Sequence, residues 1–79
     1  MIASSQIRAA RALLDWSIKE ASLMSKVSGP TIQRLERQSG AISSQPRTLI
    51  DLKRAFEEAG VEFIGTPDNG PGVRLKPKE

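Results

Sequence analysis

The sequence contains no cysteine, no histidine and no tyrosine, and its aromatic residues are one tryptophan and two phenylalanines. Without cysteine and histidine, the chain has no disulfide bond, no zinc-finger ligands and no Ser-His or Cys-His pair for nucleophilic catalysis. The carboxylates of Glu57 and Glu58 lie on a charged helix face, with no partner arrangement typical of acid–base chemistry. We therefore expect a protein that is not an enzyme and that uses no metal and no cofactor.

The sequence also lacks the long apolar segments that place a protein in a membrane. No apolar run approaches the roughly 20 residues that span a bilayer, and residues 1–10 do not follow the pattern of a secretory signal. We therefore expect a cytoplasmic protein that does not contact membranes. Because the chain has 79 residues and no covalent or metal staple, it forms one domain at most, and dimerisation is the remaining way to stabilise it.

Positive charge is concentrated in the first part of the chain. Up to Arg47, seven basic residues face three acidic ones, a balance of +4, whereas from Thr48 onward five basic residues meet six acidic ones, a balance of −1. The net charge of +3 suits a polyanionic partner. A solvated basic surface without a partner would have the same composition, so the charge alone does not identify the function.

Apolar residues at helical spacing predict four helices, the first two of which lie before Ser25. The spacing within Ile7–Leu14 predicts the first helix, with Ser4 or Ser5 as its N-cap. Ser17–Glu20 is a capping box, in which the serine hydroxyl and the glutamate carboxylate each accept a hydrogen bond from the other residue's backbone. This box predicts a short second helix that ends near Met24.

The third and fourth helices are bounded by residues with clear start and stop preferences. Ser28 is the predicted N-cap of the third helix, and because Pro30 has no N–H, the Ser28 hydroxyl should accept a hydrogen bond from Thr31. Ser39-Gly40 should end this helix. Proline at a first-turn position and glycine at the end predict a fourth helix over residues 46–60.

The period of the apolar residues changes after Gly60. Two short β-like runs, Val61–Ile64 and Val73–Lys76, flank Gly65–Gly72 and predict a hairpin with a loose turn. An isolated hairpin is marginal in water, so these strands should pack on the fourth helix or on a second copy of the chain. Residues 77–79 should be a disordered tail.

The segment Ser17–Gln38 combines a short helix, a tight turn and a second helix whose outer face is polar. Such a pair can present its second helix to the major groove of DNA, which is about 12 Å wide. In that position Arg34 can donate two hydrogen bonds to guanine, Gln33 can pair with adenine, and Pro30 or Thr31 can touch a thymine methyl group.

The runs Ile7–Ser17 and Lys26–Glu36 resemble the phage-repressor (Cro-like, XRE-like) family of helix-turn-helix regulators, over about residues 5–60. The most specific part is Val27-Ser28-x-x-Thr31-Ile32-x-Arg34-Leu35-Glu36, and the tail from Val61 is similar to that of compact bacterial members. The resemblance implies a mainly α fold, a four- to five-helix bundle followed by a short C-terminal hairpin. It also implies operator binding as a dimer and a regulatory role.

Together these observations predict a sequence-specific regulator of transcription, a repressor or autoregulator, whose helix over 28–38 binds double-stranded DNA. Residues 1–60 form the DNA-binding domain, and residues 61–76 form a dimerisation hairpin. The predicted base contacts are Gly29, Pro30, Thr31, Gln33 and Arg34. The predicted phosphate contacts are Ser17, Lys19, Ser28, Arg37, Ser43 and Arg47. The predicted homodimer interface contains Phe56, Val61, Phe63, Ile64, Val73 and Leu75.

The resemblance also implies an ion pair between Arg11 and Glu36, which ties the first helix to the third. Three features depart from the family pattern, one of which is Ala21-Ser22 in place of the usual Leu-Ala pair. Ile18 stands where the family usually has a glutamine that contacts a phosphate, and Lys26 stands where the turn usually has glycine. Lys26 should therefore adopt a left-handed conformation at some cost, or the turn should take a slightly different form.

Two alternatives remain open. The loss of that glutamine and the acidic second half of the chain fit a protein-interaction module with the same fold, such as an antitoxin-like or anti-activator subunit. The hairpin of a monomer would fold back on the fourth helix instead of forming a dimer contact. No pocket for a small-molecule effector is evident from the sequence.

Overall fold

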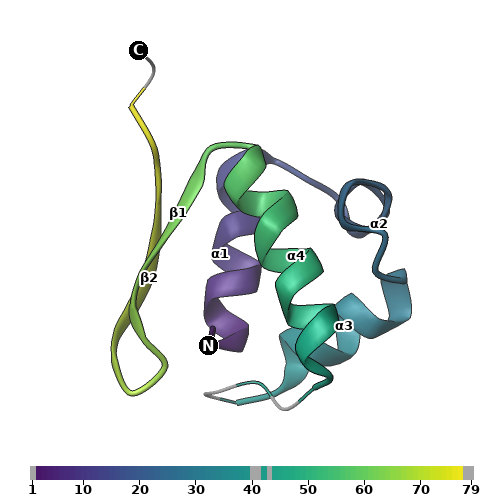
Figure 1. Cartoon of the computed structure of the whole chain (residues 1–79), viewed down its shortest axis with the longest axis horizontal. Coiled ribbons are helices and arrows are strands. Elements are labelled where there is room, and N and C mark those ends of the chain that lie inside the picture. Colours follow the sequence, from purple (N-terminus) through teal and green to yellow (C-terminus); the bar gives the residue numbers. More distant parts are fainter. Residues whose placement is uncertain (1, 40–41, 43, 78–79) are drawn as a thin grey trace.

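The computed structural model describes residues 2–39, 42 and 44–77. In this part of the chain, four helices are followed by a two-stranded antiparallel hairpin, which agrees with the expected mainly helical fold (Figure 1). The elements are α1 (Ser4–Leu14), α2 (Ile18–Ser25), α3 (Gly29–Arg37), α4 (Pro46–Glu58), β1 (Val61–Thr66) and β2 (Asn69–Leu75).

The starts of α2 and α3 follow the predicted capping chemistry. The Ser17 hydroxyl accepts a hydrogen bond from the Glu20 N–H at 3.1 Å, and the Glu20 carboxylate accepts one from the Ser17 N–H at 3.1 Å. The Ser28 hydroxyl accepts from the Thr31 N–H at 3.3 Å. Between the two helices Lys26 adopts φ 64°, so the predicted left-handed turn is confirmed.

The start of α1 differs from the prediction. Neither Ser4 nor Ser5 is the N-cap, because the cap is Ala3 and both serines lie within the helix. The Gln6 side chain replaces a capping hydroxyl, since its Oε1 accepts the Ala3 N–H at 2.8 Å. Ser4 is buried and donates instead to the backbone carbonyl of Gln38, beyond the end of α3.

The hairpin is tighter than predicted. A loose turn was expected over Gly65–Gly72, but the strands extend to Thr66 and Asn69, which pair directly. The turn requires glycine at position 65, which has φ +73°, because an added Cβ would lie 2.1 Å from the Gly70 carbonyl oxygen. The same region contains the register shift between Ile64 and Thr66.

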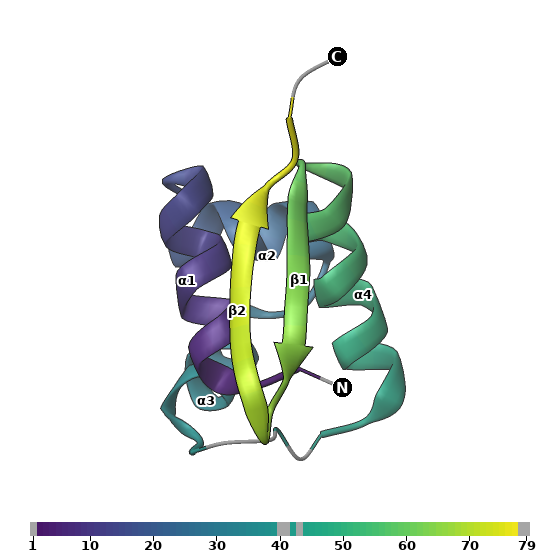
Figure 2. The ribbon, with the colours of Figure 1, turned by 90° about the vertical axis from the view of Figure 1, so that its left-hand side faces the viewer.

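The hairpin covers one side of the helical layer. Figure 2 shows both strands running across α1 and α4, with β2 beside α1 and β1 nearer α4. Both strands contact α1, and β1 also packs on α4. The predicted packing of the hairpin on the fourth helix is therefore confirmed for β1, and α1 supplies further contacts that the sequence did not predict.

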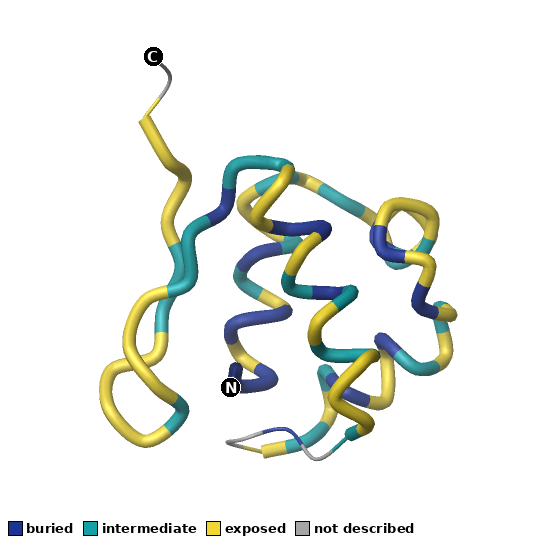
Figure 3. Tube along the Cα trace, viewed as in Figure 1, coloured by how far each residue is buried: buried dark blue, intermediate teal, exposed yellow. Residues whose placement is uncertain are grey.

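The core lies mainly among the helices, and Val61 at the start of β1 closes it on the side of the hairpin (Figure 3). Phe56 is at its centre, stacked on Trp16 with ring centroids 5.6 Å apart and edge-on to Phe63 at 6.2 Å. Phe56 and Val61 have no exposed surface. Their assignment to a dimer interface is wrong, because both side chains are already covered within one chain. The other buried apolar residues of the cluster are Ile2, Ile7, Ala10, Ala21, Val27, Ile32, Leu35, Ile42 and Leu52.

The end of the chain is only partly described. Pro77 is exposed and lies outside the helices and strands, whereas residues 78 and 79 of the predicted tail lie outside the described residues, as does Gly40 of the predicted α3 stop. No helix in the described ranges is long and apolar enough to cross a membrane.

Candidate nucleic-acid interface

Helix α3 buries one face and presents the opposite face to solvent. Ile32 and Leu35 are fully buried in the core, whereas Gln33, Arg34 and Arg37 are exposed. This division follows from the sequence, since residues three or four apart lie on the same side of a helix. The exposed face therefore consists of one amide and two guanidinium groups.

Within the described chain, the two arginines on this face have no side-chain partner, in contrast to Arg8, Arg11 and Arg74. In the described part of the structure, neither Arg34 nor Arg37 forms an ion pair or a hydrogen bond through its side chain, whereas Arg11 and Arg74 each bind a carboxylate. An exposed guanidinium keeps five N–H donors in a fixed plane, suited to phosphate and to guanine. The outer face of α3 thus has unused donors.

The carboxyl end of α3 is fixed to α1 by a bidentate ion pair, as the resemblance implied. Arg11 Nε lies 2.8 Å from Glu36 Oε2, and Arg11 Nη2 lies 3.0 Å from Oε1. The remaining nitrogen, Nη1, donates to the Trp16 carbonyl at 3.0 Å. The hydrogen bond to the Glu36 carboxylate raises the pKa of Arg11 above its ordinary value.

Other side chains of α1 strengthen the same attachment. Arg8 Nη1 donates to the backbone carbonyl of Glu36, and the Ser4 hydroxyl donates to that of Gln38. The last carbonyls of a helix have no intrahelical partner, and α1 supplies donors for two carbonyls in this region. These hydrogen bonds and the Arg11–Glu36 pair join the carboxyl end of α3 to α1.

The predicted base-contacting residues lie together at the start of α3. Pro30 and Gln33 are exposed, while Gly29 and Thr31 are partly exposed. The Ser28 hydroxyl, predicted to touch a phosphate, is already bonded within the chain, since it donates to Thr31 Oγ1 at 2.8 Å. The structure therefore places a compact group of residues here, with Ser28 acting first as a cap.

The other predicted phosphate contacts come from separate elements. Ser17 and Lys19 are exposed at the start of α2, and Arg47 is exposed in the first turn of α4. Ser43 lies outside the described residues. Ser17, Lys19 and Arg47 are thus accessible to a partner, and their contact with DNA stays a prediction.

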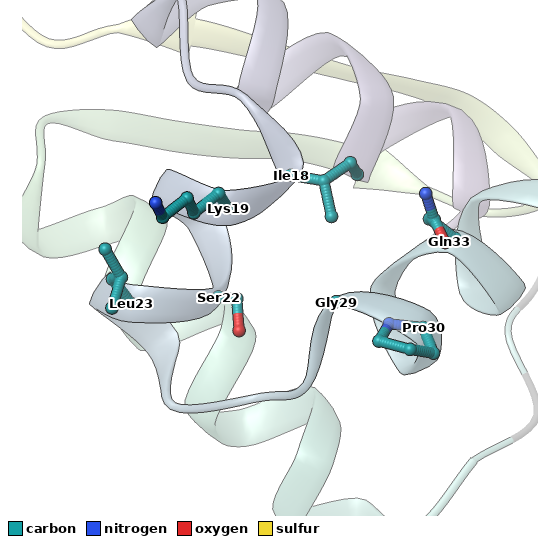
Figure 4. Close-up of a pocket in the computed structure, with 7 residues that line it drawn as sticks. All are labelled: Ile18, Lys19, Ser22, Leu23, Gly29, Pro30 and Gln33. Atoms are coloured by element: carbon teal, nitrogen blue, oxygen red, sulfur yellow. The ribbon is translucent and has the colours of Figure 1, made fainter.

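A groove of about 390 Å³ separates the start of α3 from α2 (Figure 4). It brings together predicted contacts from both helices, Lys19 on α2 and the Gly29–Gln33 segment on α3. Sequence reasoning did not include Ser22 and Leu23, which also line it. No local pattern in the sequence marks Leu23, which is apolar and yet 69% exposed. The residues lining the groove are Ile18, Lys19, Ser22, Leu23, Gly29, Pro30 and Gln33.

The described residues contain no cluster of carboxylates that could hold a metal ion. Comparison of the chain with models of protein families and with curated proteins gave no match.

Proposed function

We propose that this protein binds double-stranded DNA sequence-specifically and regulates transcription, as a repressor or autoregulator, with α3 in the major groove. The observation that carries the proposal is the outer face of α3, where Arg34 and Arg37 have no partner within the described chain, while the Arg11–Glu36 pair fixes the helix at its carboxyl end. A helix held at one end and exposed along one face is the arrangement that major-groove readers use. The resemblance to phage-repressor-like proteins supports the same function.

The expected DNA contact of each residue follows from its position along α3. Residues in the amino-terminal half of such a helix meet base edges, so Gln33 and Arg34 would read bases. Arg37 lies one turn further along and would neutralise a phosphate. Lys19 on α2 and Arg47 on α4 would add phosphate contacts on either side.

Arg34→Ala is expected to weaken binding to the cognate duplex by about 1–3 kcal/mol and to remove discrimination at one base pair. Arg37→Ala should weaken cognate and random duplexes alike and reduce the slope of log K against log salt by about one. Fluorescence anisotropy titrations at several salt concentrations measure both effects. If Arg34→Ala left the affinity for the cognate duplex unchanged, α3 would not be the helix that reads the bases.

We further propose that two copies associate through the hairpin. After folding, Phe63 and Val73 pack against the core, but Ile64 remains 41% exposed and Leu75 49% exposed. The two strands form a sheet by themselves, so each has one outer edge, and a symmetry-related strand could pair with it. Two copies of α3 would then read half-sites about 34 Å apart, as an inverted repeat.

Light scattering tests the dimer. We expect a mass of twice the chain's 8.6 kDa at micromolar concentration, and a mass of one chain for the Ile64→Glu/Leu75→Glu variant, because charged residues at the hairpin surface would oppose association. Leu13→Glu is the control, since Leu13 is similarly exposed on α1, at 41%. A wild-type protein that remains monomeric at high micromolar concentration, alone and with DNA, would contradict the dimer.

The function is tested by selection of binding sites from a pool of random duplexes. The proposal predicts enrichment of one inverted repeat by the wild-type chain and no enrichment by the Arg34→Ala/Arg37→Ala variant. Recovery of unrelated sequences by the wild-type chain would show that it lacks sequence-specific binding.

A second candidate function is supported by apolar residues near the end of α2. Leu23 and Met24 are 69% and 60% exposed, and Met24 lines a hollow whose charged residues, Lys26, Asp51, Arg54 and Glu58, have both signs. Such a surface suits a protein partner better than a polyanion, as an antitoxin-like or anti-activator subunit would require. Failure of the duplex selection would favour this function.

A further inference from the structure

The groove between α2 and α3 is apolar at its centre, although it lies on the face proposed for DNA. The Ile18 side chain extends from the start of α2 toward Gly29 (Figure 4). A Cβ added to Gly29 would lie only 3.3 Å from Ile18 Cγ2, so glycine allows the two helices to approach closely. The exposed side chains of Leu23 and Pro30 belong to the two walls.

The charges around the groove favour an anionic partner. Among the described residues that line the groove, Lys19 is the one that carries a charge, and none carries a carboxylate. Arg34 is exposed on α3, next to Gln33 of the groove wall. A polyanion is therefore attracted to this surface, while the part of the groove lined by Ile18, Leu23 and Pro30 is apolar.

We propose that this groove receives the C5-methyl group of a thymine, so that Ile18, Leu23 and Pro30 determine specificity for that base. The inference rests on the proposed DNA-binding function. In the major groove of DNA, the thymine methyl is the apolar group that the base edges present, whereas the other positions are hydrogen-bond donors and acceptors. A groove with cationic surroundings and an apolar floor matches a methyl group on a polyanion.

The position of the groove supports the same assignment. It borders the first turn of α3, which is the part of a major-groove helix that meets base edges. Ser22 and Gln33 supply polar groups at its rim, and the Gln33 amide can bind the base that pairs with or neighbours the thymine. An apolar side chain of a protein partner is the competing occupant, and the experiment separates the two.

The test replaces thymines of the selected duplex, one at a time, by deoxyuridine, which lacks only the methyl group. At one or two positions in each half-site we expect affinity to fall about four-fold, which corresponds to about 0.8 kcal/mol for one buried methylene-sized group. For the Leu23→Ala/Pro30→Ala variant, the ratio of thymine to uracil affinity at those positions should fall to near one. Both residues are exposed, and circular dichroism verifies that the variant is folded.

Ile50→Ala is the matched control, because Ile50 is an exposed apolar residue, at 50%, on α4, and it should keep the four-fold ratio. Specific binding with no effect of any deoxyuridine would overturn the thymine assignment and leave the proposed function standing. Equal loss of affinity for thymine and uracil duplexes by the Leu23→Ala/Pro30→Ala variant would overturn it as well. A wild-type chain that selects no duplex would instead refute the proposed function itself.

Discussion

Gln6→Leu is expected to lower the free energy of unfolding by about 3 kcal/mol, because a fully connected buried amide is lost. Gln6 is 2% exposed, and its Oε1 accepts the Ala3 N–H at 2.8 Å. Its Nε2 donates to the carbonyls of Ile64 and Gly72, each at 3.0 Å. One side chain thus caps α1 and joins it to both strands, and leucine can replace none of these hydrogen bonds.

Urea denaturation followed by circular dichroism measures this loss. Gln45→Leu is the control, since Gln45 is exposed and its side chain makes no capping hydrogen bond, and it should change the free energy of unfolding by less than about 0.5 kcal/mol. Hydrogen exchange should also show that Gln6→Leu loses protection first in residues 61–75. Equal stability of Gln6→Leu and the wild type would show that the amide does not hold the hairpin.

Glu36→Ala is expected to lower the free energy of unfolding by about 2 kcal/mol. Removing one partner of a fully buried ion pair costs about 3–5 kcal/mol, and the loss is smaller here because the Arg11 side chain is 26% exposed while that of Glu36 is 10% exposed. Arg11 would be left partly buried with the Trp16 carbonyl as its remaining partner. Because the pair holds the end of α3, DNA affinity should fall as well.

A double-mutant cycle isolates the pair from the effects of each side chain. Arg11→Met/Glu36→Leu should lose less stability than the sum of the single changes, with a coupling energy of about 1 kcal/mol or more. The exposed pair Lys53–Glu57, with Nζ and Oε2 3.9 Å apart, is the control and should couple by less than about 0.5 kcal/mol. Simple additivity at Arg11 and Glu36 would mean that the ion pair does not stabilise the fold.

Features encoded within a few residues could be predicted from the sequence. The capping box at Ser17–Glu20 and the Ser28 cap depend on side chains that bond their own helix. The left-handed Lys26 was expected from the resemblance, because the family usually has glycine at this position. The division of α3 into buried and exposed faces follows from helical periodicity. The Arg11–Glu36 pair joins distant segments and was expected only because the chain resembles a known family.

Features that depend on how distant segments meet could not be predicted in this way. The Ala3 cap was missed because Gln6, not a serine hydroxyl, satisfies the backbone, and the same amide binds strands near the other end of the chain. The apolar stripe of α4 does not reveal that Phe56 is covered by Trp16 and Phe63 of its own chain. Likewise, the groove at Gly29 arises where two helices approach, and no local pattern marks it.

The measurement that tests the central claim most directly compares the affinity of the full-length protein for the selected duplex and for a scrambled duplex of the same composition. Fluorescence anisotropy at about 0.15 M salt gives both dissociation constants. Sequence-specific binding predicts a ratio of at least about 10³ in favour of the selected duplex, and a ratio reduced by about ten-fold or more for Arg34→Ala. Equal dissociation constants for the two duplexes would contradict sequence-specific binding through α3.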